Sequence, residues 1–189
     1  MESLHHIIRG CIDKEPICQR LLYNRYRGFA LKIVFRYIYR YEKANDIVTD
    51  GFVKVFTHFH QFRQFVDDEE KALMAWLKRI MINCAIDELR RTSMLPEIGE
   101  IRKDVWEVSE KNDDADQLLL YKDLVSLVKE LPPNYRTVFN LYVVDGYSHS
   151  QIAELMHTSV STSRSSLSRA KSLMQKFINN MEEGKRCRI

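Results

Sequence analysis

Helical periodicity and a scarcity of chain-breaking residues limit most strongly how this chain can fold. The 189 residues include only six glycines and four prolines, whereas sheets joined by tight turns need more of both. In the first half of the chain, apolar side chains recur at three- and four-residue steps, the spacing of one helix face. Segments 16–40, 43–59 and 71–91 are predicted helices. We therefore expect an all-α protein that begins with a three-helix bundle.

The middle of the chain differs from both ends. Residues 92–117 contain Pro96, Gly99 and a polar, acidic run with little helical periodicity, which is typical of a linker. This predicts two domains, 1–91 and 118–189, joined by a flexible acidic segment. The second domain is small and only marginally able to bury a core by itself.

The net charge follows a similar division. Residues 1–91 carry +4, residues 92–123 carry −5 and residues 124–189 carry +4. Two mildly basic blocks are compatible with nucleic-acid binding. An ordinary solvated surface explains the charge alone equally well.

The C-terminal domain carries the sharpest local signal. Ser148 and Gln151 fit a capping box, and Ser159 can cap the last helix after the three-residue connection 157–159. A short helix, a tight turn and a longer helix outline a helix-turn-helix, with a plain helical hairpin as the alternative. The four predicted helices span 118–131, 134–144, 151–156 and 160–180.

The start of the last predicted helix has the composition of a DNA-reading surface. Arginine can hold guanine with two parallel hydrogen bonds, and hydroxyls can bond phosphates or base edges. A merely solvated face would normally include acids, and residues 155–181 contain none. The polar residues here are Ser161, Thr162, Arg164, Ser165, Ser166, Ser168, Arg169 and Lys171.

A second basic site is predicted on the helix 71–91. Aromatic rings beside cations are what single-stranded bases stack on, and core packing is the competing explanation for each ring. Two phenylalanines in the preceding polar loop extend the same pattern. The residues concerned are Phe62, Phe65, Trp76, Lys78, Arg79, Asn83, Arg90 and Arg91.

Paired acids mark the helix 43–59. Asp46 and Asp50 lie four residues apart and share a helix face, and such carboxylates can bind a metal or transfer protons. No histidine completes that set, so we favour an acidic patch for a basic protein partner over a plain solvated face. The sequence contains no nucleophile–base pair, glycine-rich phosphate loop or metal motif, so we expect no enzyme, no cofactor and no small-molecule substrate.

Cysteine spacing and hydropathy indicate the compartment. Cys11, Cys18, Cys84 and Cys187 are scattered, form no C-x-x-C and have no histidine at zinc-ligand spacing. A disulfide framework and a structural zinc are therefore not expected. Since no apolar run approaches the ~20 residues of a membrane helix and no secretory signal is present, we expect a cytoplasmic protein.

Three segments together resemble those of the group IV, or extracytoplasmic-function (ECF), sigma factors, promoter-recognition subunits of bacterial RNA polymerase. ANDIVTDGFVKVF (44–56) is similar to the family's core-polymerase-binding helix. AWLKRIMINCAIDELRR (75–91) is similar to its promoter-melting helix and is the most specific of the three. Residues 131–174 are similar to its C-terminal helix-turn-helix. The resemblance spans about 21–177, interrupted only by the linker.

The resemblance implies roles for individual residues. Residues 1–91 would form sigma region 2 and residues 118–189 sigma region 4. Asp46, Asp50 and Val53 would face core RNA polymerase. Phe62, Phe65, Trp76, Arg79, Asn83, Arg90 and Arg91 would contact the minus-ten element of promoter DNA. Arg164, Ser165 and Arg169 would read the minus-thirty-five element.

The family also implies a partner and shows where this chain departs from it. Such proteins are commonly held inactive by an anti-sigma factor, often membrane-anchored. His157 stands in place of a usual glycine in the helix-turn-helix turn. Ser163 replaces a buried valine, Ser166 an arginine and Gly51 a valine, and we expect these changes to affect minus-thirty-five recognition most.

Two other functions compete with this interpretation. A helix-turn-helix regulator that acts without stable polymerase binding would share the C-terminal pattern. Its sensory domain is usually an alternating strand–helix receiver, and residues 1–91 show no strand alternation. An all-helical metal enzyme using Asp46, Asp50 and the acids at 67–70 is the third possibility.

Overall fold

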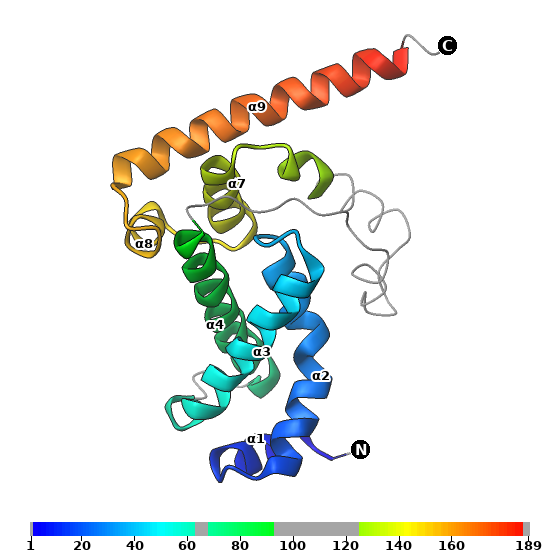
Figure 1. The fold of residues 1–189 in the computed structure, drawn as a ribbon, viewed down its shortest axis with the longest axis vertical. Helices are drawn as coiled ribbons and strands as arrows, with labels where there is room; N and C mark the ends of the chain where they lie inside the picture. The colour runs from blue at the N-terminus through cyan, green and yellow to red at the C-terminus, as the bar shows by residue number, and fades with distance from the viewer. Residues whose placement is uncertain (1, 63–67, 93–124, 187–189) are drawn as a thin grey trace. The chain divides into compact units, whose positions relative to one another are not determined.

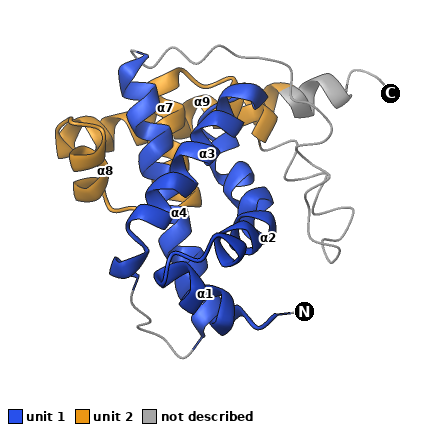
Figure 2. Ribbon diagram, turned by 60° about the horizontal axis from the view of Figure 1, so that its bottom comes forward, with its two compact units in different colours: residues 1–108 blue, residues 109–189 orange. Residues whose placement is uncertain are grey.

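The computed structural model describes residues 2–62, 68–92 and 125–186, with side chains described as far as residue 180. All secondary structure in these ranges is helical (Figure 1). The chain divides into two compact units, Met1–Val108 and Ser109–Ile189 (Figure 2). The predicted linker 92–117 lies, apart from Thr92, outside the described residues.

The first unit contains the three predicted helices and one more. The predicted helices are α2 (Pro16–Phe35), α3 (Tyr41–Thr57) and α4 (Glu69–Arg91), with the short 3₁₀ turn η1 (Phe59–Gln61) after α3. Pro16 opens α2, where its missing N–H costs no helical hydrogen bond. The unpredicted α1 (Leu4–Ile12) packs on α2 and buries Ile7, Ile8 and Cys11.

The prediction of a helix over residues 16–40 extends too far at its C-terminal end, because α2 ends at Phe35. The helix ends there because the next residues turn, with Tyr37 N donating to Val34 O at 3.0 Å and Ile38 N to the same oxygen at 2.9 Å. The apolar residues beyond that point are nevertheless buried. The spacing of these apolar residues therefore predicted their burial correctly, but it predicted a helical backbone where the chain turns.

Helices α2, α3 and α4 pack against one another around an apolar core. Gly51 allows a close approach of α3 to α4, because a Cβ there would lie 2.5 Å from Met81 Sδ. A valine at position 51 would need Met81 to move. The largest completely buried side chains of this core are Tyr37, Tyr39, Phe52, Phe59, Leu22, Leu73, Leu77, Met81, Ile82 and Ile86.

The second unit follows the predicted order of helices. Residues 125–129 are helical, followed by α7 (Pro133–Phe139), the π-helical turn η2 (Asn140–Val144), α8 (His149–Leu155) and α9 (Val160–Arg186). The predicted helix 134–144 therefore changes character at its end. Tyr147 N donates to Leu141 O at 2.9 Å, and Gly146 adopts φ +77° in the turn that leads to α8.

The cap of α8 and the connection between α8 and α9 form as predicted. Ser148 and Gln151 make the reciprocal capping box, with Ser148 N donating to Gln151 Oε1 at 2.9 Å. His157 occupies the left-handed region at φ +50°, the conformation that glycine adopts most easily. Ser159 Oγ accepts from Thr162 N at 2.9 Å and so caps the start of α9.

Candidate polymerase and nucleic-acid interfaces

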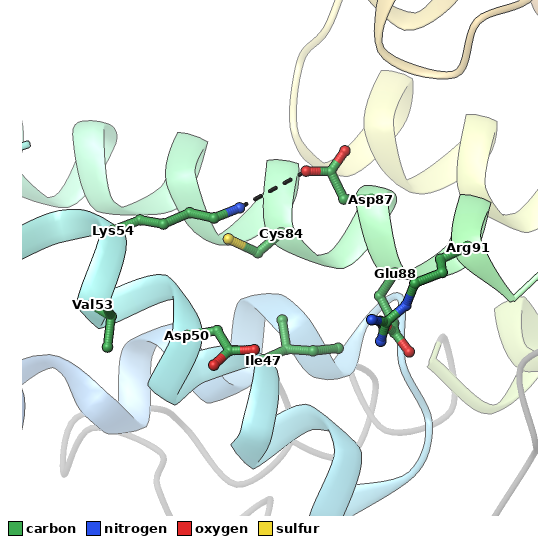
Figure 3. A pocket seen from close by; sticks show the side chains of 8 residues that line it. All are labelled: Ile47, Asp50, Val53, Lys54, Cys84, Asp87, Glu88 and Arg91. Carbon is green, nitrogen blue, oxygen red and sulfur yellow. Dashed lines mark hydrogen bonds and ion pairs between the residues drawn. The ribbon is translucent and has the colours of Figure 1, made fainter. Parts of the chain in front are cut away.

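One face of α3 presents acids and an exposed apolar residue. Asp46, Asp50 and Val53 are all exposed, Val53 by 59%. Their spacing of four and three residues places them along one side of the helix. Asp50 and Val53 also line a shallow groove of about 400 Å³ between α3 and α4 (Figure 3). The structure thus groups the three residues that the sequence predicted for polymerase binding.

The other wall of this groove carries a buried carboxylate on α4. Glu88 is only 9% exposed and lies 3.1 Å from Lys43 Nζ on α3. Arg91 also pairs with it, through Nη2 and Oε2. Figure 3 shows Glu88 and Arg91 side by side at the end of the groove. This pair of cations balances a charge that would otherwise be costly to bury.

A second groove, of about 460 Å³, collects three of the predicted minus-ten residues. Trp76, Arg79 and Asn83 line it on α4, facing His58 and Gln61 from the segment that follows α3. Arg79 is exposed, whereas Trp76 and Asn83 are half-buried. An aromatic ring, a cation and an amide therefore share one concave surface, which is the chemistry that holds a nucleobase.

The aromatic rings here form a cluster anchored in the core. Trp76 lies 5.3 Å from the buried Phe59 and 5.4 Å from Phe62, measured between ring centroids. Trp76 and Phe62 are both half-buried, so each packs on the core with one part and meets solvent with another. Phe65 lies outside the described residues.

Both cations at the end of α4 are paired with acids one turn before them. Arg90 Nη1 is 3.2 Å from Asp87 Oδ1, and Lys54 Nζ lies 3.9 Å from the other oxygen of the same carboxylate. Arg91 pairs with Glu88 in the same way. Each arginine therefore already has a carboxylate partner on its own helix.

The first half of α9 presents a basic, hydroxyl-rich face. Arg164, Ser165 and Arg169 are exposed, and Arg169 Nη1 donates to the Tyr135 hydroxyl on α7 at 3.1 Å. Within the described residues, Arg164 has no ion-pair partner. Ser166, expected on this face, is instead buried, because it points into the unit with Ser163 and Leu167.

Ser163, which stands where the family has a buried valine, is itself buried and bonded to another helix. It is completely buried and lies 2.9 Å from His149 Nδ1, an oxygen-to-nitrogen distance that makes a hydrogen bond between α9 and α8. The His149 ring stacks on Tyr142 at 4.6 Å. A polar pair thus joins the two helices where an apolar contact was expected.

Sequence reasoning did not single out Glu88, His149 or Tyr135. Glu88 stands in the charged run Asp87-Glu88-Leu89-Arg90-Arg91, which is typical of a solvated face, so nothing marked it as buried. His149 was visible only as the residue after a cap. Each residue has a partner on another helix, Lys43 of α3 for Glu88 and Ser163 of α9 for His149, and helical periodicity does not predict such contacts.

Comparisons with known proteins agree with the resemblance. Sigma-70 region 2 matches residues 22–94, and sigma-70 region 4 matches residues 121–174. The RNA polymerase sigma-H factor of Pseudomonas aeruginosa is 25% identical over 168 residues, covering 84% of each chain. The ECF RNA polymerase sigma-E factor of Haemophilus influenzae is 28% identical over 168 residues, covering 84% of this chain and 86% of its own.

A solved structure supports the fold. It is the sigma factor RpoE in complex with the anti-sigma factor NepR from Bartonella quintana, with a TM-score of 0.50 and 18% identity, covering 85% of this chain and 96% of that one. In the part of the chain that is described, no helix is long and apolar enough to span a membrane. Two sigma regions in the family's order and relatives across most of the chain settle the assignment. The chain belongs to the sigma-70 family as an ECF RNA polymerase sigma factor, a non-enzymatic initiation factor that directs polymerase to promoters.

Proposed function

We propose that this sigma factor uses three surfaces, one for core polymerase, one for the minus-ten element and one for the minus-thirty-five element. Residues 1–91 hold core polymerase and the minus-ten element, residues 118–189 read the minus-thirty-five element, and residues 92–117 join them. The observation that carries the proposal is the match to both sigma regions, combined with exposed charges of opposite sign on α3 and α9. An acidic face suits a protein partner, and a basic face suits DNA.

The polymerase surface is the exposed face of α3. Asp46 and Asp50 supply negative charge, and Val53 supplies exposed apolar area beside them. Charge guides and orients such an encounter, while the apolar contact contributes affinity. The neighbouring groove between α3 and α4 offers a concave edge to the same partner.

The minus-ten surface is the groove lined by Trp76, Arg79 and Asn83. A base released from the duplex can stack on the exposed part of Trp76 or Phe62, while Arg79 and Asn83 supply hydrogen bonds. Arg90 and Arg91 contact phosphates at the end of α4. Phe65 belongs to the same proposed surface.

The minus-thirty-five surface is the start of α9. The first residues of a recognition helix are the ones that reach base edges in the major groove. Arg164 and Ser165 are exposed there. Arg169 lies further along the helix, oriented by the Tyr135 hydroxyl, and is placed to contact bases or the adjoining phosphates.

An anti-sigma factor is the proposed regulatory partner. The RpoE structure was solved with an anti-sigma factor bound, and a protein that covers the α3 face would block polymerase. In the family such factors are often membrane-anchored. We place the sigma factor itself in the cytoplasm, where it meets polymerase.

Reconstitution tests the proposal. Purified protein is mixed with sigma-free core polymerase, co-elution is measured, and transcription is followed from a promoter library. Co-elution with promoter-specific transcripts is expected, and it should fail for the Asp46→Ala, Asp50→Ala double variant but not for Asp13→Ala, an exposed acid between α1 and α2. DNA binding by the protein alone without co-elution would instead support the free-standing regulator.

A further inference from the structure

Three side chains with metal-binding chemistry meet where α1 runs beside the start of α2. They are the carboxylate of Glu2, the imidazole of His6 and the thiol of Cys18, and their ligand atoms all lie within 4.8 Å of one another. His6 Nε2 is 3.8 Å from Glu2 Oε2. None of the three belongs to the polymerase or DNA surfaces.

The backbone is arranged to place the thiol at this point. His6 and Gly10 lie four residues apart on one side of α1, and Glu2, which precedes the N-cap Ser3, approaches His6 from before the helix. Cys18 lies directly over Gly10, because a Cβ at position 10 would come within 2.3 Å of Cys18 Sγ. Any other residue at position 10 would displace the sulfur from the cluster.

The turn between α1 and α2 also holds Cys18 close to Gly10. Lys14 adopts the left-handed conformation at φ +61°, and Glu15 N donates to Gly10 O at 2.8 Å. Cys18, in the first turn of α2, therefore lies beside α1. Residues separated by twelve positions in sequence become neighbours, which explains why spacing alone predicted no zinc ligand near a cysteine.

The geometry is close to what a tetrahedral ion needs. Zinc bonds of 2.0–2.3 Å place neighbouring ligand atoms about 3.5 Å apart. Cys18 is buried and forms the base of the cluster, while the side chains of Glu2 and His6 are 50% and 60% exposed. Rotation of the two exposed side chains can close the remaining gap without moving either helix.

The donor set selects a class of metal. Sulfur and imidazole nitrogen favour zinc and similar borderline ions, whereas magnesium and calcium prefer oxygen ligands throughout. We propose that Glu2, His6 and Cys18 bind one divalent ion of the zinc class, with the fourth position open to water, and that the ion fastens the start of α1 to α2.

Binding requires Cys18 to lose its proton. The thiol donates to Glu15 Oε2 at 3.3 Å. When the metal binds, the S–H bond breaks, the sulfur gives its electron pair to the metal, and the proton leaves through the exposed Glu15 carboxylate to water. Because metal binding displaces this proton, apparent metal affinity increases with pH.

Cobalt(II) is the probe, because a cobalt–thiolate bond absorbs light by charge transfer. Zinc(II) added afterwards should displace the cobalt and remove this absorption. The reduced full-length protein is titrated with Co²⁺ alone. We expect one equivalent to bind with this absorption, in the parent and equally in the controls Cys84→Ser and Cys187→Ser. Cys18→Ser should abolish the absorption, and His6→Ala should weaken binding at least tenfold.

Each outcome decides the proposal. His6 is exposed, so His6→Ala tests the site without endangering the fold, and circular dichroism shows whether Cys18→Ser remains helical. Loss of the absorption in Cys18→Ser together with weaker binding by folded His6→Ala supports the site. Absence of any charge-transfer absorption, its persistence in Cys18→Ser, or an unchanged affinity of His6→Ala overturns it.

Discussion

The two units bury different chemistry. Among the described residues, the first unit buries one charged or polar side chain, Glu88, in a core that is otherwise apolar and aromatic. The smaller second unit buries several beside its apolar residues. These are Arg136, Thr137, Asn140, Ser163 and Ser166.

This difference has a physical cause and a consequence. A domain of about 70 residues has little apolar surface to bury, so its structure depends more on hydrogen bonds that must all be made. On the surface, in contrast, it is the first unit whose predicted DNA-binding arginines at the end of α4 are held by polar partners. Arg90 and Arg91 of the first unit are paired with acids, whereas Arg164 of the second is available to DNA without breaking an ion pair within the described residues.

The largest effect should come from removing a buried polar anchor in the second unit. Arg136 is 3% exposed, and its Nη1 donates to Lys129 O at 2.7 Å. Arg136→Ala leaves a cavity and removes the buried hydrogen bond to the Lys129 carbonyl, so we expect the free energy of unfolding of that unit to decrease by about 2–4 kcal/mol. Hydrogen exchange across α7–α9 measures it. The exposed Arg20→Ala should change stability by less than about 0.5 kcal/mol, and an equally small change at Arg136 would refute the contrast between the two cores.

The next effect concerns Arg164 on α9, which has no ion-pair partner in the described part of the chain. Arg164→Ala should weaken binding to a minus-thirty-five fragment by about 5–150-fold, equivalent to the ~1–3 kcal/mol of a bidentate base contact. Arg164→Lys keeps the charge but loses the fork geometry, so it should lose specificity more than overall affinity. Lys176→Ala, exposed later on the same helix, is the matched control in fluorescence anisotropy. Unchanged specificity in both Arg164 variants would show that this side chain does not contact bases.

Local signals predicted the elements well. The capping box at Ser148, the cap at Ser159 and the strained turn at His157 depend on residues close in sequence, so the pattern contained the whole interaction. The predicted all-α class is correct for the same reason. The helix ends near Phe35 and Asn140 were missed because tertiary packing, and not periodicity, decides where those helices stop.

Contacts between helices were the part that sequence could not supply. The sequence showed Ser163 only as a replacement for a buried valine, and the structure places His149 opposite it. Nothing in the sequence marked Glu88 as buried, and its partner Lys43 comes from another helix. Each depends on the register of two helices, and one helix's periodicity does not contain that information. The roles of the individual site residues remain predictions.

The Ser163–His149 pair offers a sharper test of the polar core. Ser163→Val removes the hydroxyl and leaves His149 Nδ1 without its partner, at an expected cost of about 1 kcal/mol. His149→Leu alone should leave Ser163 buried and unpaired at a similar cost. In the double variant two apolar side chains face each other, so the losses should not add, and a double-mutant cycle by urea unfolding should give a coupling of about 1 kcal/mol. Simple additivity would mean that the pair contributes nothing to the second unit.

The smallest expected change in stability is that of Asp87→Asn, which should nevertheless alter the salt dependence of DNA binding. Asp87 is exposed and holds both Arg90 and Lys54, so Asp87→Asn should alter unfolding by less than about 0.5 kcal/mol. It releases Arg90 at the end of α4 and Lys54 on α3, and each added phosphate contact steepens the dependence of log affinity on log salt by about 0.9. Arg90→Ala should change that slope by about the same amount in the opposite direction, while Asp13→Asn should leave it unaltered. If neither Asp87→Asn nor Arg90→Ala changes the slope, Arg90 lies outside the DNA interface, and its pairing with Asp87 serves the fold alone.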